Sequence, residues 1–282
     1  MTAALSADTV AAAHHKLKVR KIDFEFTDDI PEFWYAGDPF RTLLLAALSG
    51  GFPEGERFFI DSVRHFQDRI TDPALKKAIR SFIGQEAHHA KQHHALNGFL
   101  SRRGYPVDSI DRGVGKLMNL FRNYMTPERQ LAHTAAIEHF TAIMAEHVIM
   151  GDLDELRKMA PEMARIWAWH AVEESEHKAV AFDVYKETVD DEWVRISQMM
   201  LATFLFLTFS SIDFLRMLRR SGHMTDLKMW MNGINHYWGR PGVFRRLIPK
   251  YLRYYRRDFH PWQEDNSARV DSVKTEFLGE WA

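Results

Sequence analysis

The sequence predicts an all-α fold, a bundle of long helices. Apolar residues recur at helical spacing from residue 38 onward, and strand-like alternation is almost absent after residue 40. Capping residues and prolines stand where several of the periodic segments begin, and glycines stand where some of them end. The chain has 282 residues, of which 46% are apolar, so a sizeable core can form.

These signals place the elements in order. The glycines at positions 50 and 51 stop the first apolar run, and Pro53 suits the first turn of the next helix. Thr126 and Pro127 are a typical cap and first helical residue. We predict an N-terminal arm (1–37), extended in part, a helical domain (38–260) and a C-terminal tail (261–282). The predicted helices span residues 38–48, 53–70, 73–101, 110–123, 126–150, 161–189 and 193–220.

Composition excludes several classes of function. The chain has no cysteine, so disulfides, thiolate ligands and cysteine nucleophiles are excluded, and any metal must be held by His, Asp or Glu. The formal net charge of −1 gives no general attraction to nucleic acid. The first residues lack the pattern of a secretory signal, so we expect a cytoplasmic protein.

Two segments bear on membranes. Residues 196–212 carry no charge, but the run is shorter than the roughly 20 residues of a membrane span. We therefore interpret it as a buried helix or a peripheral membrane contact. Residues 239–257 carry seven Lys/Arg and no acid. We interpret this segment as a solvated basic face against the acidic tail, with attraction to anionic lipid or an acidic partner as the alternative.

Two stretches carry glutamate and histidine at Glu-x-x-His spacing. In GQEAHHAKQH, Glu86 and His89 share a helix face with apolar neighbours, so this face points into the core. In AWHAVEESEHK, the residues His170, Glu174 and His177 share one narrow arc. Two such pairs on two long helices are typical of a dinuclear carboxylate site, which also takes one glutamate from each of two further helices.

Glu56 and Glu138 complete this pattern. Glu138 has small residues on its helix face and Glu56 lies on an apolar stripe, where a buried charge needs compensation. The four glutamates are separated by 30, 52 and 36 residues. The shorter separations suit antiparallel hairpins, and the long one suits the crossover of a ferritin-like bundle. Four carboxylates and two divalent cations would form a neutral cluster, with bridging glutamates holding the ions roughly 3.5–4 Å apart.

Each candidate has a structural alternative. His170 is interpreted as an additional ligand to the second metal, beside Glu174, and could instead be a core histidine. His93 is interpreted as lining the pocket or supporting a ligand, with ligation as the alternative. Glu56 could be a first-turn glutamate favoured by the helix dipole. Glu173 neighbours Glu174 but lies off the histidine arc.

Three sequence blocks carry a family resemblance. FPEGERFF, GQEAHHAKQH and HAVEESEHKAVAFDVY resemble blocks of a bacterial family described as predicted metal-dependent hydrolases, over about residues 35–260. This resemblance implies a ferritin-like fold, here a four-helix bundle with additional C-terminal helices. The last block is also similar to histidine-rich di-iron N-oxygenases of the p-aminobenzoate type. The ligands implied by the resemblance are Glu56, Glu86, His89, Glu138, His170, Glu174 and His177.

The ligand pattern favours a di-iron carboxylate oxidoreductase that activates O₂ to oxidise a hydrophobic small molecule, because such Glu-rich bundle sites are mostly redox sites. We expect two iron ions, with manganese or zinc as alternatives. A separate protein would donate electrons, since no flavin or Fe–S motif is present. The alternatives are a di-metal hydrolase of esters or phosphoesters and a non-enzymatic metal-binding bundle. A homodimer is the family-level expectation.

Overall fold

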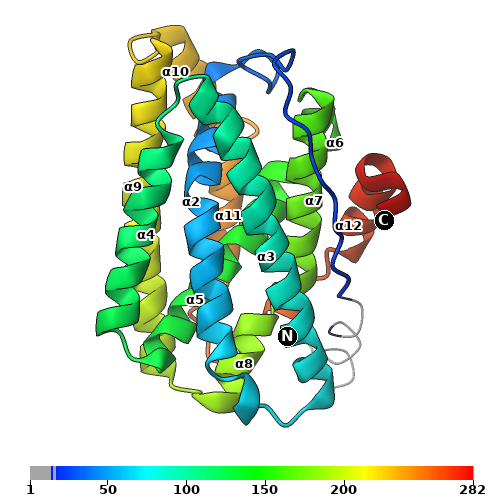
Figure 1. The fold of residues 1–282 in the computed structure, drawn as a ribbon, viewed down its shortest axis with the longest axis vertical. Coiled ribbons are helices and arrows are strands. Elements are labelled where there is room, and N and C mark those ends of the chain that lie inside the picture. The colour runs from blue at the N-terminus through cyan, green and yellow to red at the C-terminus, as the bar shows by residue number, and fades with distance from the viewer. Residues whose placement is uncertain (1–13, 15–16, 282) are drawn as a thin grey trace.

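The computed structural model describes residues 14 and 17–281, and they form an all-α bundle, as predicted (Figure 1). The first residues of the predicted arm, 1–13, 15 and 16, and the last residue of the tail lie outside the described residues. The longer helices are α2 (Pro39–Arg64), α3 (Pro73–Arg102), α4 (Val107–Tyr124), α5 (Pro127–Met144), α7 (Pro161–His177) and α9 (Glu192–Ser221). The shorter ones are α6 (Leu153–Arg157), α8 (Val180–Thr188), α10 (Leu227–Ile234), α11 (Val243–Arg253) and α12 (Ser267–Val273).

Helix α2 corrects the prediction of two helices separated at residues 50–53. It runs unbroken through Pro53, whose missing N–H leaves the carbonyl of Ser49 without its helical partner. The side chain of Asn97 takes that place and donates to the Ser49 carbonyl at 2.9 Å. Gly50 allows α2 and α4 to pack closely, because a Cβ there would lie 3.1 Å from the Ile110 side chain of α4, which is tighter than an ordinary contact. Glu56 therefore lies in the middle of a long helix, not near a helix start.

The other predicted helices agree with the structure, with two differences. Thr126 caps α5 as predicted, its hydroxyl accepting from the Arg129 N–H at 3.4 Å, but a π-helical turn (Ala145–Ile149) replaces the predicted last turns. The predicted helix over 161–189 is two helices, α7 and α8, which separate directly after His177. Nothing in the structure explains that break.

Two buried apolar clusters fix the level of the candidate site in the bundle. One cluster contains buried apolar residues of α2 up to Ala47, of α3 from Leu96 onward and of α7 up to Val172. The other takes α2 from Phe58 onward and α3 up to Phe82. The stretches of α2 and α3 that carry candidate ligands lie between these clusters, inside the bundle.

Residues 17–37 pack along the bundle without regular secondary structure. Arg20, Ile22 and Phe24 are buried while their neighbours are mostly exposed, which is the alternation of an extended segment. Figure 1 shows this segment running beside α7. The backbone N–H of Arg20 donates to Glu173 of α7 at 3.0 Å, so the segment reaches the edge of the candidate site.

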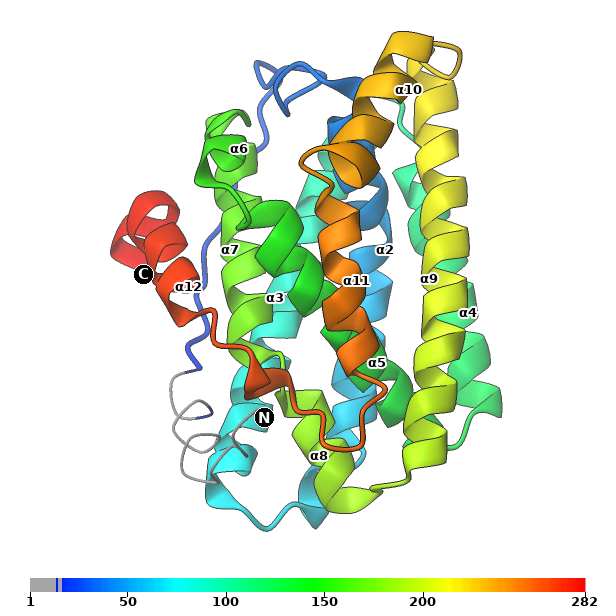
Figure 2. The same cartoon turned by 180° about the vertical axis from the view of Figure 1, so that it is seen from behind.

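Figure 2 shows α9, α10 and α11 together on the opposite side of the bundle from α3. The uncharged segment 196–212 lies in α9. Among the described residues, α9 is the one helix that is long enough and apolar enough to cross a membrane, judged by length and composition alone. Its inner side packs on the bundle and buries Met199 and Ala202. In the basic segment, Lys250 and Arg253 form ion pairs with Glu264 of the tail, as predicted for a basic face against the tail.

Candidate metal centre

The structure brings together all seven side chains that the sequence singled out as ligands. Helix α2 contributes one, α3 two, α5 one and α7 three, and all are buried, at most 5% exposed. They face one another across the interior of the bundle. They are Glu56, Glu86, His89, Glu138, His170, Glu174 and His177.

Three groups of these side chains could hold a metal ion: two share no residue, and the third, Glu86, His89 and Glu174, shares one residue with each. We call Glu86, Glu138 and His177 the inner group, and Glu56, His89 and His170 the cavity-side group; within each, one donor atom per residue lies within 4.8 Å of the others. In the inner group, His177 Nε2 lies 3.0 Å from Glu86 and 3.4 Å from Glu138.

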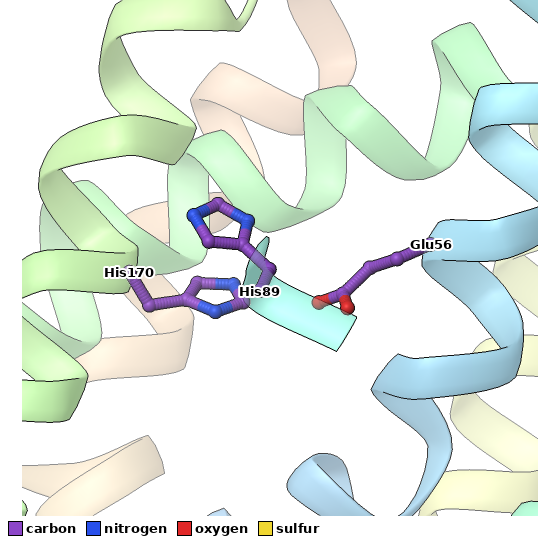
Figure 3. A group of neighbouring side chains, drawn as sticks. All are labelled: Glu56, His89 and His170. Atoms are coloured by element: carbon purple, nitrogen blue, oxygen red, sulfur yellow. The ribbon is translucent and has the colours of Figure 1, made fainter. Parts of the chain in front are cut away.

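Figure 3 shows the two imidazoles of the cavity-side group and the carboxylate of Glu56 pointing toward a common centre. The rings of His89 and His170 are stacked, with centroids 4.4 Å apart. Glu174 lies between the groups, with Oε1 3.7 Å from His89, 3.3 Å from His170 and 3.5 Å from His177. Glu86 also approaches His89, at 3.9 Å, so these two carboxylates are placed to bridge.

The unsatisfied polar atoms of the site fit metal ions. Both carboxylate oxygens of Glu56, Glu86 and Glu138 have no hydrogen-bond partner among the described residues. Neither does the central nitrogen of His89 (Nδ1) or of His177 (Nε2). Buried polar atoms normally have a partner. Oxygen and imidazole donors without one form the set that iron, manganese or zinc binds.

The electrostatics of the site also fit added positive charge. Burial raises the pKa of Glu56, Glu86 and Glu138, and repulsion from neighbouring carboxylates adds to this for Glu56. Burial lowers the pKa of His177, but the surrounding glutamates outweigh it and hold that pKa well above its usual value. Without metal, burial thus favours the protonated form of these three carboxyl groups, whereas at Glu174 the neighbouring histidines outweigh burial and hold the pKa well below its usual value. Divalent ions can replace those protons and neutralise the cluster.

The outer nitrogen of each candidate histidine faces a polar partner, which leaves the other nitrogen for an ion. His177 Nδ1 lies 3.1 Å from the Gln85 side-chain oxygen, an arrangement in which the ring donates and Nε2 is free. His89 Nε2 lies 3.2 Å from the carboxylate of Glu173, which favours the proton on that nitrogen and leaves Nδ1 for the centre.

A chain of hydrogen bonds sets the tautomer of His170. Asn97 donates its NH₂ to the Ser49 carbonyl, so its oxygen is free to accept from the Ser49 hydroxyl, at 2.9 Å. That hydroxyl then accepts from His93 Nδ1 at 2.9 Å, which leaves His93 Nε2 as the acceptor for His170 Nδ1, at 2.8 Å. His170 Nε2 keeps a lone pair directed at the cavity-side group. Burial lowers the pKa of His93 well below its usual range, in keeping with a neutral ring.

A cavity of about 340 Å³ reaches the site, and a much smaller one also borders His170 and Glu174. Its walls come mainly from apolar side chains of α2, α4, α5 and α9, and Glu56, His170 and Glu174 lie at its inner end. The three residues of the inner group do not line it. The volume is within the usual range for a small-molecule pocket.

The structure corrects one assignment and adds partners that the sequence did not predict. His170 lies beside Glu174 as expected, with Nε2 3.3 Å from Oε1, but it groups with Glu56 and His89 rather than with His177. His93 supports His170, as interpreted. Sequence reasoning missed the roles of Gln85, Glu173, Ser49, Asn97 and Arg20. Gln85 and Glu173 directly precede ligand candidates, which was the available signal; Ser49, Asn97 and Arg20 gave none.

The comparisons with known proteins are consistent with this geometry. No curated protein and no solved structure shows a significant match to the chain. One protein family, described as predicted metal-dependent hydrolase, matches residues 18–265. The ferritin-like superfamily and the likeness to di-iron oxygenases stay predictions. Because the match spans most of its length, the chain belongs to this family of predicted metal-dependent hydrolases.

Proposed function

We propose that this protein is a two-metal enzyme that acts on an apolar small molecule entering through the cavity. The observation that carries the proposal is the meeting of two features: donor atoms without partners at the centre, and an apolar cavity that ends at one of the two groups. One ion would be held by the inner group and one by the cavity-side group, with Glu86 and Glu174 between them.

The protein's own contribution is to orient substrate and exclude water. The apolar walls would hold a hydrocarbon chain with its reactive end toward Glu56 and His170. Among the described lining residues the only cationic side chain of the Lys/Arg type is Arg216, and it pairs with Asp213 at 2.8 Å. A phosphate group would therefore find little to bind along the walls, whereas an uncharged apolar substrate fits them.

Hydrolysis of an ester with an apolar acyl chain is the reaction that the family description supports. Two bound divalent ions would supply a Lewis acid and a water of lowered pKa. The cavity would align the ester carbonyl with the cavity-side group. The ester is favoured over a phosphoester because the lining carries little positive charge.

Oxidation of an apolar substrate by O₂ is the second candidate, and the ligand set favours it. A glutamate from each of two helices and Glu-x-x-His from two others is the arrangement of di-iron and di-manganese carboxylate proteins. Bound iron would supply the redox chemistry, and a separate protein would supply electrons. The apolar walls would keep water from the reaction.

Metal analysis together with two activity assays tests the proposal. The protein is purified, its metals are identified and counted, and anaerobic cleavage of p-nitrophenyl esters of increasing acyl length is compared with O₂ consumption by the reduced iron form. Anaerobic cleavage that improves with acyl length supports hydrolysis; substrate-dependent O₂ consumption without cleavage supports oxidation. Two bound metals with neither activity would indicate a metal-binding bundle and overturn the proposal of an enzyme.

Glu56→Ala and Glu54→Ala form a matched pair for these assays. Both residues lie on α2, but Glu56 is buried at the site whereas Glu54 pairs with Arg57 near the surface. Activity that belongs to the centre should be lost in the first variant and retained in the second. Equal activity in both would mean that the reaction occurs elsewhere.

A further inference from the structure

One face of the molecule gathers most of the exposed apolar side chains. Of the 16 large apolar residues that are exposed in the described part of the chain, 14 lie between positions 193 and 252, in or beside α9, α10 and α11. We call this the α9 face (Figure 2). Its members are Trp193, Met200, Phe204, Leu207, Phe209, Ile212, Leu215, Met224, Leu227, Met231, Ile234, Trp238, Ile248 and Leu252.

The exposure of these side chains is large. Phe204 is 65% exposed, Leu207 56% and Met200 61%, and their spacing by four and three puts them on one stripe of α9. The remaining two exposed residues, Leu120 and Tyr124, lie on α4, the helix that lines the cavity opposite α9. An apolar patch this extensive is typical of an interaction surface.

The same part of the chain is strongly basic. Residues 214–257 contain eleven Lys/Arg and one acidic residue, a formal charge of +10, so the rest of the chain carries −11 to give the total of −1. Some of these cations are paired within the protein, as Lys250 and Arg253 are with Glu264. Among the described residues, however, none forms an ion pair with the exposed Arg245, Arg246 or Arg257.

Apolar and aromatic side chains beside unpaired cations are the features of a surface that lies in the headgroup layer of an anionic membrane. Trp193 and Trp238, 76% and 54% exposed, suit that layer. A second copy of the chain fits less well, because a symmetric dimer through this face would bring two basic surfaces together. Helix α9 does not suit a span, since its inner side packs on the bundle and buries Arg195 and Gln198.

We propose that the α9 face docks on an anionic lipid surface, with α9 lying along the membrane rather than crossing it. Phe209 and Ile212 are exposed and also line the cavity, so the cavity opens beside α9, the helix that carries the exposed stripe. On the proposed function, the substrate is then an amphiphile taken directly from the bilayer. Docking itself does not depend on the reaction.

Binding to vesicles tests the proposal without any activity assay. The purified chain is mixed with vesicles of phosphatidylcholine, alone or with phosphatidylglycerol, and binding is followed by co-sedimentation at increasing salt. We expect binding to the anionic vesicles that weakens with salt. The double substitution R245A/R246A should weaken binding about 30-fold, because each arginine near the lipid surface contributes about 1 kcal/mol. Phe204→Ser with Leu207→Ser should weaken it about tenfold or more.

The matched control is Lys76→Ala with Arg80→Ala, which removes two exposed cations from α3, away from the α9 face. It should bind as the unmodified protein does, and circular dichroism and metal content should be unchanged in all variants. Absence of binding to anionic vesicles, or equal binding by all three double variants, would overturn the proposal. So would a dimer that the Phe204/Leu207 variant converts to a monomer, because a second copy would then cover the face. Vesicle binding without a reaction would leave docking standing and count against the proposed function alone.

Discussion

The inner group and the cavity-side group draw on the same two donor types but differ in composition and surroundings. The inner group has two glutamates and one histidine and is sealed inside the bundle, whereas the cavity-side group has one glutamate and two histidines and borders the cavity. Two carboxylates neutralise a divalent ion, while one carboxylate leaves net positive charge. A closed ligand set is typical of a structural ion, and one that keeps an open position is typical of a catalytic ion.

On the proposed function, this difference suggests that the two ions would have different roles. The inner ion would hold α3, α5 and α7 together, and the cavity-side ion would meet substrate. The supporting residues differ as well: Gln85 holds His177 of the inner group, and Ser49 holds His170 indirectly, through His93. The two groups can therefore be perturbed separately, which makes these different roles testable.

The largest expected effect is that of removing both ions. The metal-free centre leaves buried carboxylates that repel one another, and an ion that binds only the folded state stabilises it by mass action. With free metal at a thousand times each dissociation constant, chelation should lower the free energy of unfolding by about 4 kcal/mol for each ion removed. Denaturant unfolding of loaded and chelated protein measures this difference. Equal stability of the two forms would mean that the centre binds no ion.

The second effect concerns the number of ions bound. Glu56→Ala should leave one ion per chain, held by the inner group, whereas Glu138→Ala should disturb the inner ion first. Glu86→Ala and Glu174→Ala should each abolish two-metal loading, because these carboxylates lie between the groups. Metal analysis after desalting measures the ratio, with circular dichroism to show that the helices persist. Glu54→Ala should bind two ions, and full loading of Glu86→Ala would mean that the ligands are assigned wrongly.

The sequence predicted the helices and the candidate ligands because both depend on local spacing. The i, i+3 and i+4 positions put Glu86 with His89, and His170 with Glu174 and His177, whatever the rest of the fold does. The all-α fold followed from the same periodicity. The continuity of α2 through Pro53 was not predictable, since it depends on Asn97, 44 residues away.

The grouping of His170 was missed for the same reason. Sequence spacing places it beside Glu174, but which ion it approaches depends on how α7 faces α2 and α3, and thus on tertiary packing. The contact of Arg20 with Glu173 likewise depends on tertiary packing, because the extended segment that carries Arg20 lies beside α7 but is far from α7 in sequence. Local periodicity therefore predicted the ligand candidates, and packing decided how they pair.

The third effect separates the two groups through their supporting residues. Gln85→Ala removes the acceptor of His177 Nδ1, and Ser49→Ala removes the hydroxyl that orients His93 and, through it, His170. Loss of such a partner typically weakens metal affinity by about 10–100-fold. In competition with a chelator, Gln85→Ala should lower the metal affinity of the inner group, which we expect to be the tighter site. Ser49→Ala should lower the metal affinity of the cavity-side group, the weaker site. If both variants weakened the same site equally, the two groups would not be independent.

The smallest expected effect tests whether the cavity wall beside the cavity-side group is dry. His133 lines the cavity and is 3% exposed, and burial lowers its pKa to about 4. The unfolded chain, with a histidine pKa near 6.5, binds a proton more readily than the folded one, so acidification favours unfolding. Between pH 7 and pH 6 this should cost roughly 0.7 kcal/mol.

His133→Gln provides the comparison, because glutamine does not titrate in this range. The difference in free energy of unfolding between the two proteins should narrow as the pH falls from 7 to 6, whatever the metal ligands contribute, since that contribution is common to both. A constant difference would show that His133 keeps an ordinary pKa and that water fills the cavity. The cavity-side group would then be a wet site, and the contrast with the sealed inner group would rest on its ligands alone.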